Sequence, residues 1–293
     1  HCPPPPQRHH RTRPPRRTTL LPVNHVVSSE ADVWLLGGEL RPVLSLSRVV
    51  LQNGMLALVS ASRSWQKHAA NAAKPIIVVG SVNADIVVEI NRMPLTGETI
   101  GARTTDTGKM YGGGKGANQA VAAAQLGHPT KFVGSFGNDQ NAVALRQMLL
   151  DKSVDTSLAV QSNVPNGQAF IFLTESGENS IILVGGSNMS GWDAPADVQQ
   201  HLEDAMAGAA AVMLQREIPD DINVAVALLA VKHRVPVILD AGGMDDQPPA
   251  ELLRLCTYMC PNETELARLT GGMPTATAAE AVVAARALQV SVD

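Results

Sequence analysis

The sequence has few cysteines, little net charge and no long apolar run. Only three of its 293 residues are cysteines, Cys2, Cys256 and Cys260, which argues against a disulfide framework and favours a reducing compartment. The formal net charge of −4 gives no basis for binding nucleic acid. No segment approaches the roughly 18 consecutive apolar residues of a membrane helix, so we expect no membrane partner. A hydrophobic content of 45% suffices for one large or two ordinary domains with a buried core.

Two cysteines stand close together in the segment CTYMC. A spacing of this kind can hold a metal ion, but no histidine or further cysteine lies near Cys256 and Cys260 in the sequence. The pattern therefore favours two small apolar residues in a buried segment over a metal site.

The first 73 residues differ from the rest of the chain. The chain begins at His1, and its first methionine is Met55. Residues 1–29 contain five arginines, many prolines and no acidic residue, a composition typical of an organelle transit peptide. The segment RTRPPRR would also suit a nuclear or polyanion-binding patch. We interpret residues 1–73 as a leader, which implies a plastid or mitochondrial protein if it is a transit peptide and a cytoplasmic protein otherwise.

From Lys74 onward, short apolar runs alternate with helical segments. Runs such as IIVVGS, AAVMLQ and VPVILD predict strands, and the segments between them predict helices of ten to fifteen residues. This alternation predicts an α/β fold, a mostly parallel, Rossmann-like sheet with helices on both faces. The segments around 86–112 and 168–185 are β-rich without a helix and predict a small β lid, the second as a hairpin around ESGEN. The final segment, TAAEAVVAARALQVSVD, predicts a helix that runs into the start of a strand.

Polar residues follow several predicted strands, where open α/β sheets bind their ligands. They are Asn83 and Asp85 in GSVNAD, Glu217 after AAVMLQ, Asp240 after VPVIL, and Asn262 with Glu265 in PNETE. Such amides and carboxylates suit a polyhydroxy ligand, and they suit Mg²⁺ equally. Each also has a purely structural interpretation, because Asn and Asp often form turns and caps and Asn-x-x-Glu is the spacing of a capping box.

A glycine-rich segment, YGGGKGANQAVAAAQLG, leads into a predicted helix. It is not a phosphate-binding P-loop, because Lys115 is followed by Gly116 rather than by Ser or Thr. It matches a dinucleotide fingerprint only in its letters, since no hydrophobic strand precedes it. The segment can let a ligand touch the main chain at Gly114 and Gly116, with Lys115 and Asn118 as polar partners. The alternative is a packing cluster of glycines beside a solvated lysine.

In this order and spacing, GSVNAD, GGKGANQAVAA, LQRE and PNETE resemble the ribokinase branch of the PfkB-type sugar and nucleoside kinase superfamily. The resemblance covers about residues 75–293. It implies an α/β fold with a β lid that also forms a homodimer. It further implies ATP-dependent phosphorylation of D-ribose at the 5-hydroxyl, with Mg²⁺ and a monovalent cation, K⁺, as cofactors. A glycine loop and a lid suit this chemistry, because phosphoryl transfer must exclude water.

The resemblance also implies roles for individual residues. Asp240 stands where ribokinases often carry an asparagine that faces ATP, and here AGG follows it in place of a proline-rich turn. Asp240 and Asn262 would contact ATP and its phosphates, and Glu265 would order Mg²⁺. The residues that would bind the sugar are Asn83, Ala84, Asp85, Gly114, Lys115, Gly116, Ala117, Asn118 and Glu217.

The catalytic base of this family is the Asp of a Gly-Ala-Gly-Asp motif, which does not occur in these 293 residues. The same turn supplies an anion hole of backbone N–H groups, and the family places the adenine pocket and the K⁺ site in that region too. We therefore expect residues 74–293 to be a kinase domain incomplete at its C-terminus, without a catalytic residue and inactive as given. The alternatives are another sugar or nucleoside kinase, a non-catalytic sugar-binding protein and, more distantly, a dehydrogenase that binds NAD.

Overall fold

The computed structural model describes residues 48–49, 74–105, 107–192 and 196–292. The predictions for residues 1–47 and 50–73, a transit peptide or a basic binding patch, lie outside these described residues. Within the described part of the chain, no helix is both long and apolar enough to cross a membrane.

The centre of the fold is a seven-stranded parallel sheet with the strand order β1-β13-β12-β11-β2-β5-β7. Its strands are β1 (Arg48–Val49), β2 (Ile76–Val79), β5 (Thr130–Val133), β7 (Val154–Asp155), β11 (Ala211–Gln215), β12 (Val237–Asp240) and β13 (Tyr258–Cys260). The inner strands are short apolar runs such as IIVV in β2, because both of their faces are covered by helices. The parallel α/β sheet that the sequence predicts is confirmed.

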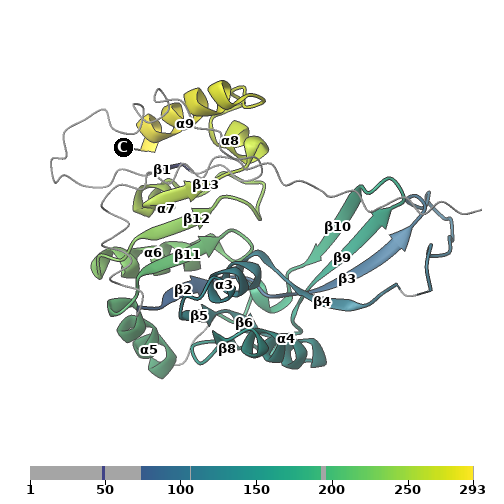
Figure 1. Cartoon of the computed structure of the whole chain (residues 1–293), viewed down its shortest axis with the longest axis horizontal. Helices are drawn as coiled ribbons and strands as arrows, with labels where there is room; N and C mark the ends of the chain where they lie inside the picture. The colour runs from purple at the N-terminus through teal and green to yellow at the C-terminus, as the bar shows by residue number, and fades with distance from the viewer. Residues whose placement is uncertain (1–47, 50–73, 106, 193–195, 293) are drawn as a thin grey trace, which may run out of the picture. The chain divides into compact units, whose positions relative to one another are not determined.

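Helices cover both faces of this sheet (Figure 1). They are α3 (Lys115–Gln125), α4 (Gln140–Asp151), α5 (Ala196–Ala207), α6 (Asp220–Lys232), α7 (Ala250–Leu255), α8 (Glu263–Leu269) and α9 (Ala278–Val292). In β2, Ile77 and Val79 belong to a core cluster with α5, α6 and α7, whereas Val78 between them packs with α3 and α4. This alternation follows from the two-residue period of a strand. A third cluster joins α8 and α9 to Met259 of β13.

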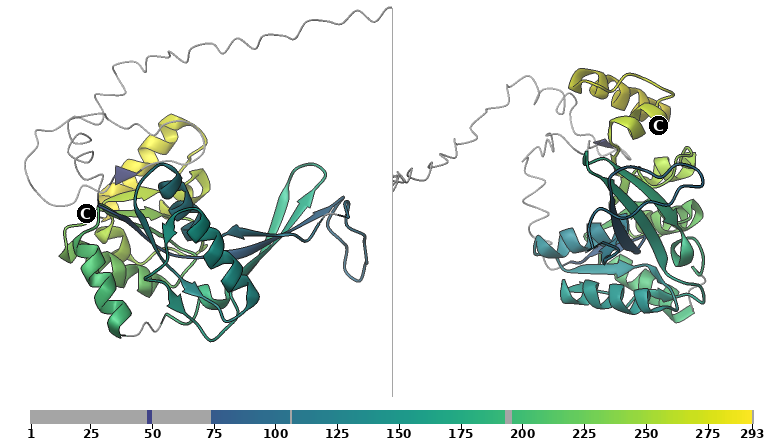
Figure 2. Two further views of the ribbon diagram at one scale, coloured as in Figure 1. Left: turned by 60° about the horizontal axis from the view of Figure 1, so that its bottom comes forward. Right: turned by 90° about the vertical axis from the view of Figure 1, so that its right-hand side faces the viewer.

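A second, four-stranded sheet extends away from the first and forms the β lid (Figures 1 and 2). Its order is β10-β9-β3-β4, with β3 (Asn83–Ile90), β4 (Met110–Gly113), β9 (Gly167–Thr174) and β10 (Asn179–Val184). Strands β9 and β10 form the antiparallel hairpin around ESGEN, and β3 runs parallel to β9. Two short strands, β6 (Ser135–Phe136) and β8 (Val160–Gln161), and the 3₁₀ helix η1 (Gly186–Asn188) connect the lid to the main sheet.

Two parts of the fold differ from the sequence analysis. The expected strand start at the end of the chain is wrong, because α9 continues through Val292. The helix persists since Ala281, Ala284 and Leu288 lie on one helical face and pack in the third core cluster. In addition, Arg48 and Val49, which belong to the predicted leader, form β1 and pair with β13.

Cys256 has the environment of a buried apolar residue, and Cys260 is partly buried at the end of β13. Cys256 is 1% exposed within the core, and burial raises its pKa to about 12. Burial, and after it the charge of Asp240, raises the pKa of Cys260 to about 11. Among the described residues, no three His, Cys, Asp or Glu side chains are grouped to hold a metal ion. The described part of the chain therefore gives no support to the metal-site interpretation.

Candidate active site

A cavity of about 230 Å³ lies where the base of the lid meets the carboxyl ends of β11 and β12. It is lined by Asn83, Leu183, Val184, Gly185, Asn188, Met189, Arg216, Glu217, Gly243 and Met244. This is the edge of the sheet at which open α/β folds bind their ligands. A cavity of about 320 Å³ along α4 contains none of the predicted site residues. We therefore take the smaller cavity as the candidate site, because predicted site residues line it.

Asn83 and Asp85 are the first and third residues of β3, so their side chains lie on the same face of the lid sheet. Asn83 lines the cavity and is only 4% exposed. Burial, and after it the charge of Glu217, raises the pKa of Asp85 from 3.8 to about 6. Ala84, between them, is fully buried in the core and supports the strand by packing. The two polar residues thus face the same region as Glu217.

The glycine segment brings the N-terminus of α3 against the end of β2. Gly114 has a φ of +90°, which favours glycine, and its hypothetical Cβ would lie 2.9 Å from the main-chain nitrogen of Asn83. A Cβ on Gly116 would lie 2.7 Å from the main-chain nitrogen of Ser81. These two glycines are therefore required for close packing of main chain on main chain, the alternative that the sequence left open.

The next two residues of the predicted sugar loop lie away from the cavity lining. Ala117 is 5% exposed and packs in the core beneath α3. Asn118 is exposed on the surface of the same helix. In the ligand-free structure, neither residue contributes to the walls of the cavity.

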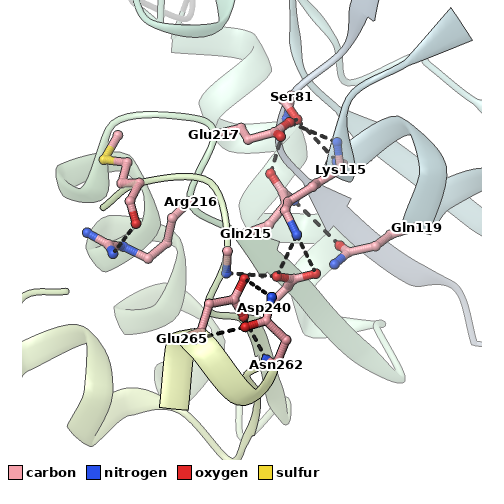
Figure 3. Close-up of polar contacts among 12 residues, drawn as sticks. Ser81, Lys115, Gln119, Gln215, Arg216, Glu217, Asp240, Asn262 and Glu265 are labelled. Carbon is pink, nitrogen blue, oxygen red and sulfur yellow. Dashed lines mark hydrogen bonds and ion pairs between the residues drawn. The ribbon is translucent and has the colours of Figure 1, made fainter. Parts of the chain in front are cut away.

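Glu217 connects the cavity to the glycine segment (Figure 3). Its Oε2 atom accepts a hydrogen bond of 2.6 Å from the Ser81 hydroxyl and one of 2.9 Å from the main-chain N–H of Lys115. The Ser81 hydroxyl in turn accepts a hydrogen bond of 3.2 Å from the N–H of Gly116. Ser81 is fully buried, so this three-way contact holds the Glu217 carboxylate against the start of α3.

Lys115 points toward Asp240 at the end of β12 (Figure 3), and it is not among the residues that line the cavity. Its Nζ donates to Asp240 at 3.1 Å from Oδ1 and 3.4 Å from Oδ2, and the Asp240 side chain is 7% exposed. Gly242 provides the space, since a Cβ there would lie 2.5 Å from both Lys115 Nζ and Glu265 Oε1. The structure thus groups Lys115, predicted for the sugar, with two residues predicted for the phosphates and the metal.

Asn262 and Glu265 form the capping box that the sequence allowed. Asn262 Oδ1 accepts a hydrogen bond of 2.8 Å from the N–H of Glu265. Glu265 accepts one of 2.8 Å from the N–H of Asn262 and one of 3.0 Å from its Nδ2. This box begins α8 and holds the Glu265 carboxylate at the end of β13, beside Asp240 (Figure 3).

Arg216 is a fully buried guanidinium at the wall of the cavity. It donates to both carboxylate oxygens of Asp220, at 3.1 and 2.7 Å, and to the main-chain carbonyls of Met244 and Asp246. The main-chain N–H of Arg216 donates to the main-chain carbonyl of Gly242. Arg216 therefore ties the loop after β12 to the end of β11, where Glu217 lies.

Two residues of the site were missed by the sequence analysis, Ser81 and Asn188. Ser81 stands directly after the first predicted strand, a position that could have been included with Asn83 and Asp85. Asn188 follows the lid hairpin in GGSN, and no local pattern relates it to the cavity. It reaches the site only because η1 folds back against the start of β3.

Comparison with known proteins places this arrangement in a family. Residues 73–292 match the pfkB family carbohydrate kinase. The chain belongs to the pfkB carbohydrate kinase family. A curated ribokinase of Arabidopsis thaliana is 48% identical over 221 residues, which are 74% of this chain and 57% of that protein. A deoxyribokinase of Salmonella typhi is 32% identical over 216 residues, 73% of this chain and 68% of that protein.

A solved structure of a pfkB-type enzyme supports the same assignment. The structure of Arabidopsis thaliana ribokinase complexed with ribose and ATP aligns with a TM-score of 0.67 and 46% identity. The alignment covers 75% of this chain and 69% of that one. The chain thus spans somewhat more than half the length of its curated Arabidopsis relative and more than two thirds of the solved chain.

Proposed function

We propose that this chain carries the sugar site and part of the phosphate site of a ribokinase, which transfers the γ-phosphoryl group of ATP to the 5-hydroxyl of D-ribose. The observation that carries the proposal is the cavity beneath the lid, with Asn83 and Glu217 in its wall and Asp85 close by. The similarity to ribokinases, one of them complexed with ribose and ATP, supports it.

The charges at the cavity favour a neutral polyhydroxy ligand over a phosphorylated one. Glu217 lines the cavity, and its charge adds to the effect of burial in raising the pKa of the Asp85 carboxyl. The cation in the wall, Arg216, already donates to Asp220 and to main-chain carbonyls. A ligand hydroxyl can donate to a carboxylate and accept from an amide, whereas a phosphate would meet negative charge here.

The phosphates of ATP are proposed to bind near Lys115, Asp240 and Asn262. Lys115 is the cation of this region, and Asp240 and Glu265 are carboxylates beside it. Mg²⁺ takes oxygen ligands and usually keeps several waters, so one or two carboxylates and the phosphates suffice to hold it. Both carboxylates are fixed by hydrogen bonds in the chain, Glu265 by its capping box and Asp240 by Lys115 and the N–H of Gly242. Mg²⁺ would supply charge neutralisation there, whereas K⁺ binding stays a prediction from the family.

The chain's own residues position the sugar and do not supply the base. Asn83, Asp85 and Glu217 are proposed to bind hydroxyls, and the glycine segment to close over them. The motif that carries the base in this family does not occur in the sequence, and Asp85 is assigned to the sugar. A missing general base typically costs about 10²–10⁴-fold in rate, so we propose sugar binding with little or no turnover for this polypeptide.

The lid is also proposed to form a homodimer. Its outer strand β10 carries four consecutive apolar residues, Ile181, Ile182, Leu183 and Val184, that are between 47% and 56% exposed. Because successive side chains of a strand alternate between its two faces, each face of β10 exposes two of these residues, and exposed apolar side chains on an outer strand are typical of an interface. Light scattering after size exclusion tests this, because Ile182→Lys should shift a dimer to a monomer; a monomeric wild type contradicts the proposal.

Calorimetric titration of the full 293-residue chain tests the sugar site. We expect D-ribose to bind more tightly than D-fructose or adenosine, and NAD not to bind. Glu217→Gln should weaken D-ribose binding about tenfold, since one charge-assisted hydrogen bond contributes about 1.5 kcal/mol. The matched control is Glu263→Gln, at an exposed residue of α8. The proposal would be overturned if no binding is detected at about 10 mM D-ribose, which means a binding free energy weaker than about −3 kcal/mol.

One further titration and one turnover assay separate the alternatives. The deoxyribokinase relative makes 2-deoxy-D-ribose the second candidate ligand, and tighter binding of this sugar than of D-ribose would favour it. Incubation with ATP, Mg²⁺ and D-ribose, followed by quantification of ribose 5-phosphate, measures turnover. Robust turnover would contradict the expected inactivity while supporting the ribokinase assignment. Binding without turnover favours a sugar-binding role for this polypeptide.

A further inference from the structure

The main chain of Val82, directly before β3, is held by two buried asparagines from the two ends of the lid hairpin. Asn166 precedes β9, and its Nδ2 donates to the carbonyl of Val82 at 2.9 Å. Asn188 ends η1 after β10, and it is 2% exposed. Its Oδ1 accepts from the N–H of Val82 at 2.9 Å, while its Nδ2 donates to the Val82 carbonyl at 3.2 Å. Both ends of the hairpin therefore bind the main chain directly before Asn83.

These contacts determine which way the Asn188 amide faces. A main-chain N–H only donates and a main-chain carbonyl only accepts, so the Asn188 oxygen must face the Val82 N–H and its nitrogen the Val82 carbonyl. The same Asn188 Nδ2 also lies 2.6 Å from the Asn83 side chain. Because this nitrogen can only donate, the Asn83 atom that faces it must be the acceptor, Oδ1.

The Asn83 amide is thereby oriented as well. With Oδ1 taken by Asn188, the Nδ2 group of Asn83 lies on the other side of the amide, and it makes no hydrogen bond to any of the described residues. Asn83 and Asn188 both line the cavity. Gly167 leaves room for their contact, since a Cβ there would lie 2.1 Å from Asn188 Nδ2 and 2.5 Å from Asn83 Oδ1.

We infer that Asn188 is a positioning residue that fixes the Asn83 amide with its NH₂ group toward the ligand. The inference rests on the proposed sugar site. It sets a chemical requirement, because the ligand atom at Asn83 must accept a hydrogen bond, as a sugar hydroxyl oxygen does. The carboxylates of Asp85 and Glu217 provide the complementary acceptors, so one hydroxyl can accept from Asn83 while another donates to a carboxylate.

Side-chain NMR of the full chain labelled with [¹⁵N]asparagine tests the orientation without any variant in the measured sample. The two NH₂ groups are assigned by the loss of a signal in Asn83→Ser and in Asn188→Ser. In the ligand-free wild type, the Asn188 NH₂ protons should exchange slowly with water, and those of Asn83 should exchange at least about tenfold faster because they lack a partner. Slow exchange at Asn83 together with fast exchange at Asn188 overturns the inference.

Asn188→Asp then tests the positioning itself. The carboxylate introduced by this substitution can still accept a hydrogen bond from the Val82 N–H, and Asn166 still donates one to the Val82 carbonyl. The chain should therefore fold. The carboxylate cannot donate to Asn83 Oδ1, so the Asn83 amide should turn over and its NH₂ protons should become slowly exchanging. Binding of D-ribose should weaken about tenfold, as one misplaced buried hydrogen bond implies. Unchanged exchange at Asn83 in this variant overturns the inference even if ribose binding falls.

Failure of the inference and failure of the proposed function give different results. If Asn83 and Asn188 exchange as expected but D-ribose shifts neither signal, the orientation stands and the sugar site is wrong. If D-ribose binds and shifts the Asn188 NH₂ signal but not that of Asn83, the sugar site stands and the inference is wrong. If Asn188→Asp does not fold, the exchange rates of the wild type alone decide.

Discussion

Replacing Asp85 with asparagine should stabilise the ligand-free chain at neutral pH. Burial and the charge of Glu217 disfavour the ionised Asp85 carboxyl, which raises its pKa from 3.8 to about 6. The folded state therefore holds this proton more tightly than the unfolded state. It follows that stability falls as pH rises from about 4 to about 6.5, with the full penalty above that range. Asn has the same shape and no charge, so Asp85→Asn removes the penalty.

The size of the effect follows from the same pKa values. A pKa of about 6 in place of 3.8 corresponds to at most about 3 kcal/mol at pH 7.5. Asp85 is partly exposed, and solvent screens part of this energy, so we expect about 1–2 kcal/mol. At pH 4 the carboxyl is largely neutral in the folded state, and the advantage of Asp85→Asn should fall below about 0.5 kcal/mol.

Urea unfolding of both proteins between pH 4 and pH 8 measures the difference. The control is Asp204→Asn, at an exposed residue of α5, which should change the free energy of unfolding by less than about 0.5 kcal/mol at any pH. Asp85→Asn should at the same time weaken D-ribose binding, as expected where a ligand site stores unfavourable charge. The reasoning is refuted if Asp85→Asn is less stable than wild type at pH 7.5, or if its gain in the free energy of unfolding does not depend on pH.

Two further substitutions test the packing and the buried charge of the site. Gly116→Ala should destabilise the chain by about 1–3 kcal/mol and lower Tm, because its Cβ would lie 2.7 Å from the main-chain nitrogen of Ser81; Gly101→Ala, with nothing within 4 Å, should not. Arg216→Met should cost about 3–5 kcal/mol in urea unfolding, since it leaves a carboxylate and carbonyls without their donor, whereas Arg92→Met at an exposed ion pair should leave the urea midpoint nearly unchanged. A loss of under about 1 kcal/mol in Arg216→Met would show that the guanidinium is not needed.

Much of the fold follows from local patterns in the sequence. Apolar runs such as IIVV and VILD are long enough for strands and too short for helices, and their alternation with helices predicted the parallel sheet. The hairpin around ESGEN and the capping box of Asn262 and Glu265 depend on residues only a few positions apart. Such features are predictable because their hydrogen bonds form between neighbours in the chain.

The end of the chain shows where local patterns are insufficient. The segment LQVSV contains β-branched residues, which favour a strand, yet it lies in α9. Packing of Ala281, Ala284 and Leu288 in the third core cluster outweighs this weak preference. Intrinsic propensities differ by less than about 1 kcal/mol per residue, so burial of one helical face decides the outcome.

The sequence by itself determined the α/β class, the lid hairpin and the set of polar residues at the strand ends, because strand and helix periods are local properties. Only the tertiary structure decided how those residues are grouped. Ser81 meets Glu217 across 136 positions, Lys115 meets Asp240 across 125, and Asn188 meets Asn83 across 105. Gly116 lets α3 approach Ser81 closely, a contact between main chains that no periodicity encodes. Contacts of this kind arise from the packing of whole elements, so the geometry of the site follows from the fold.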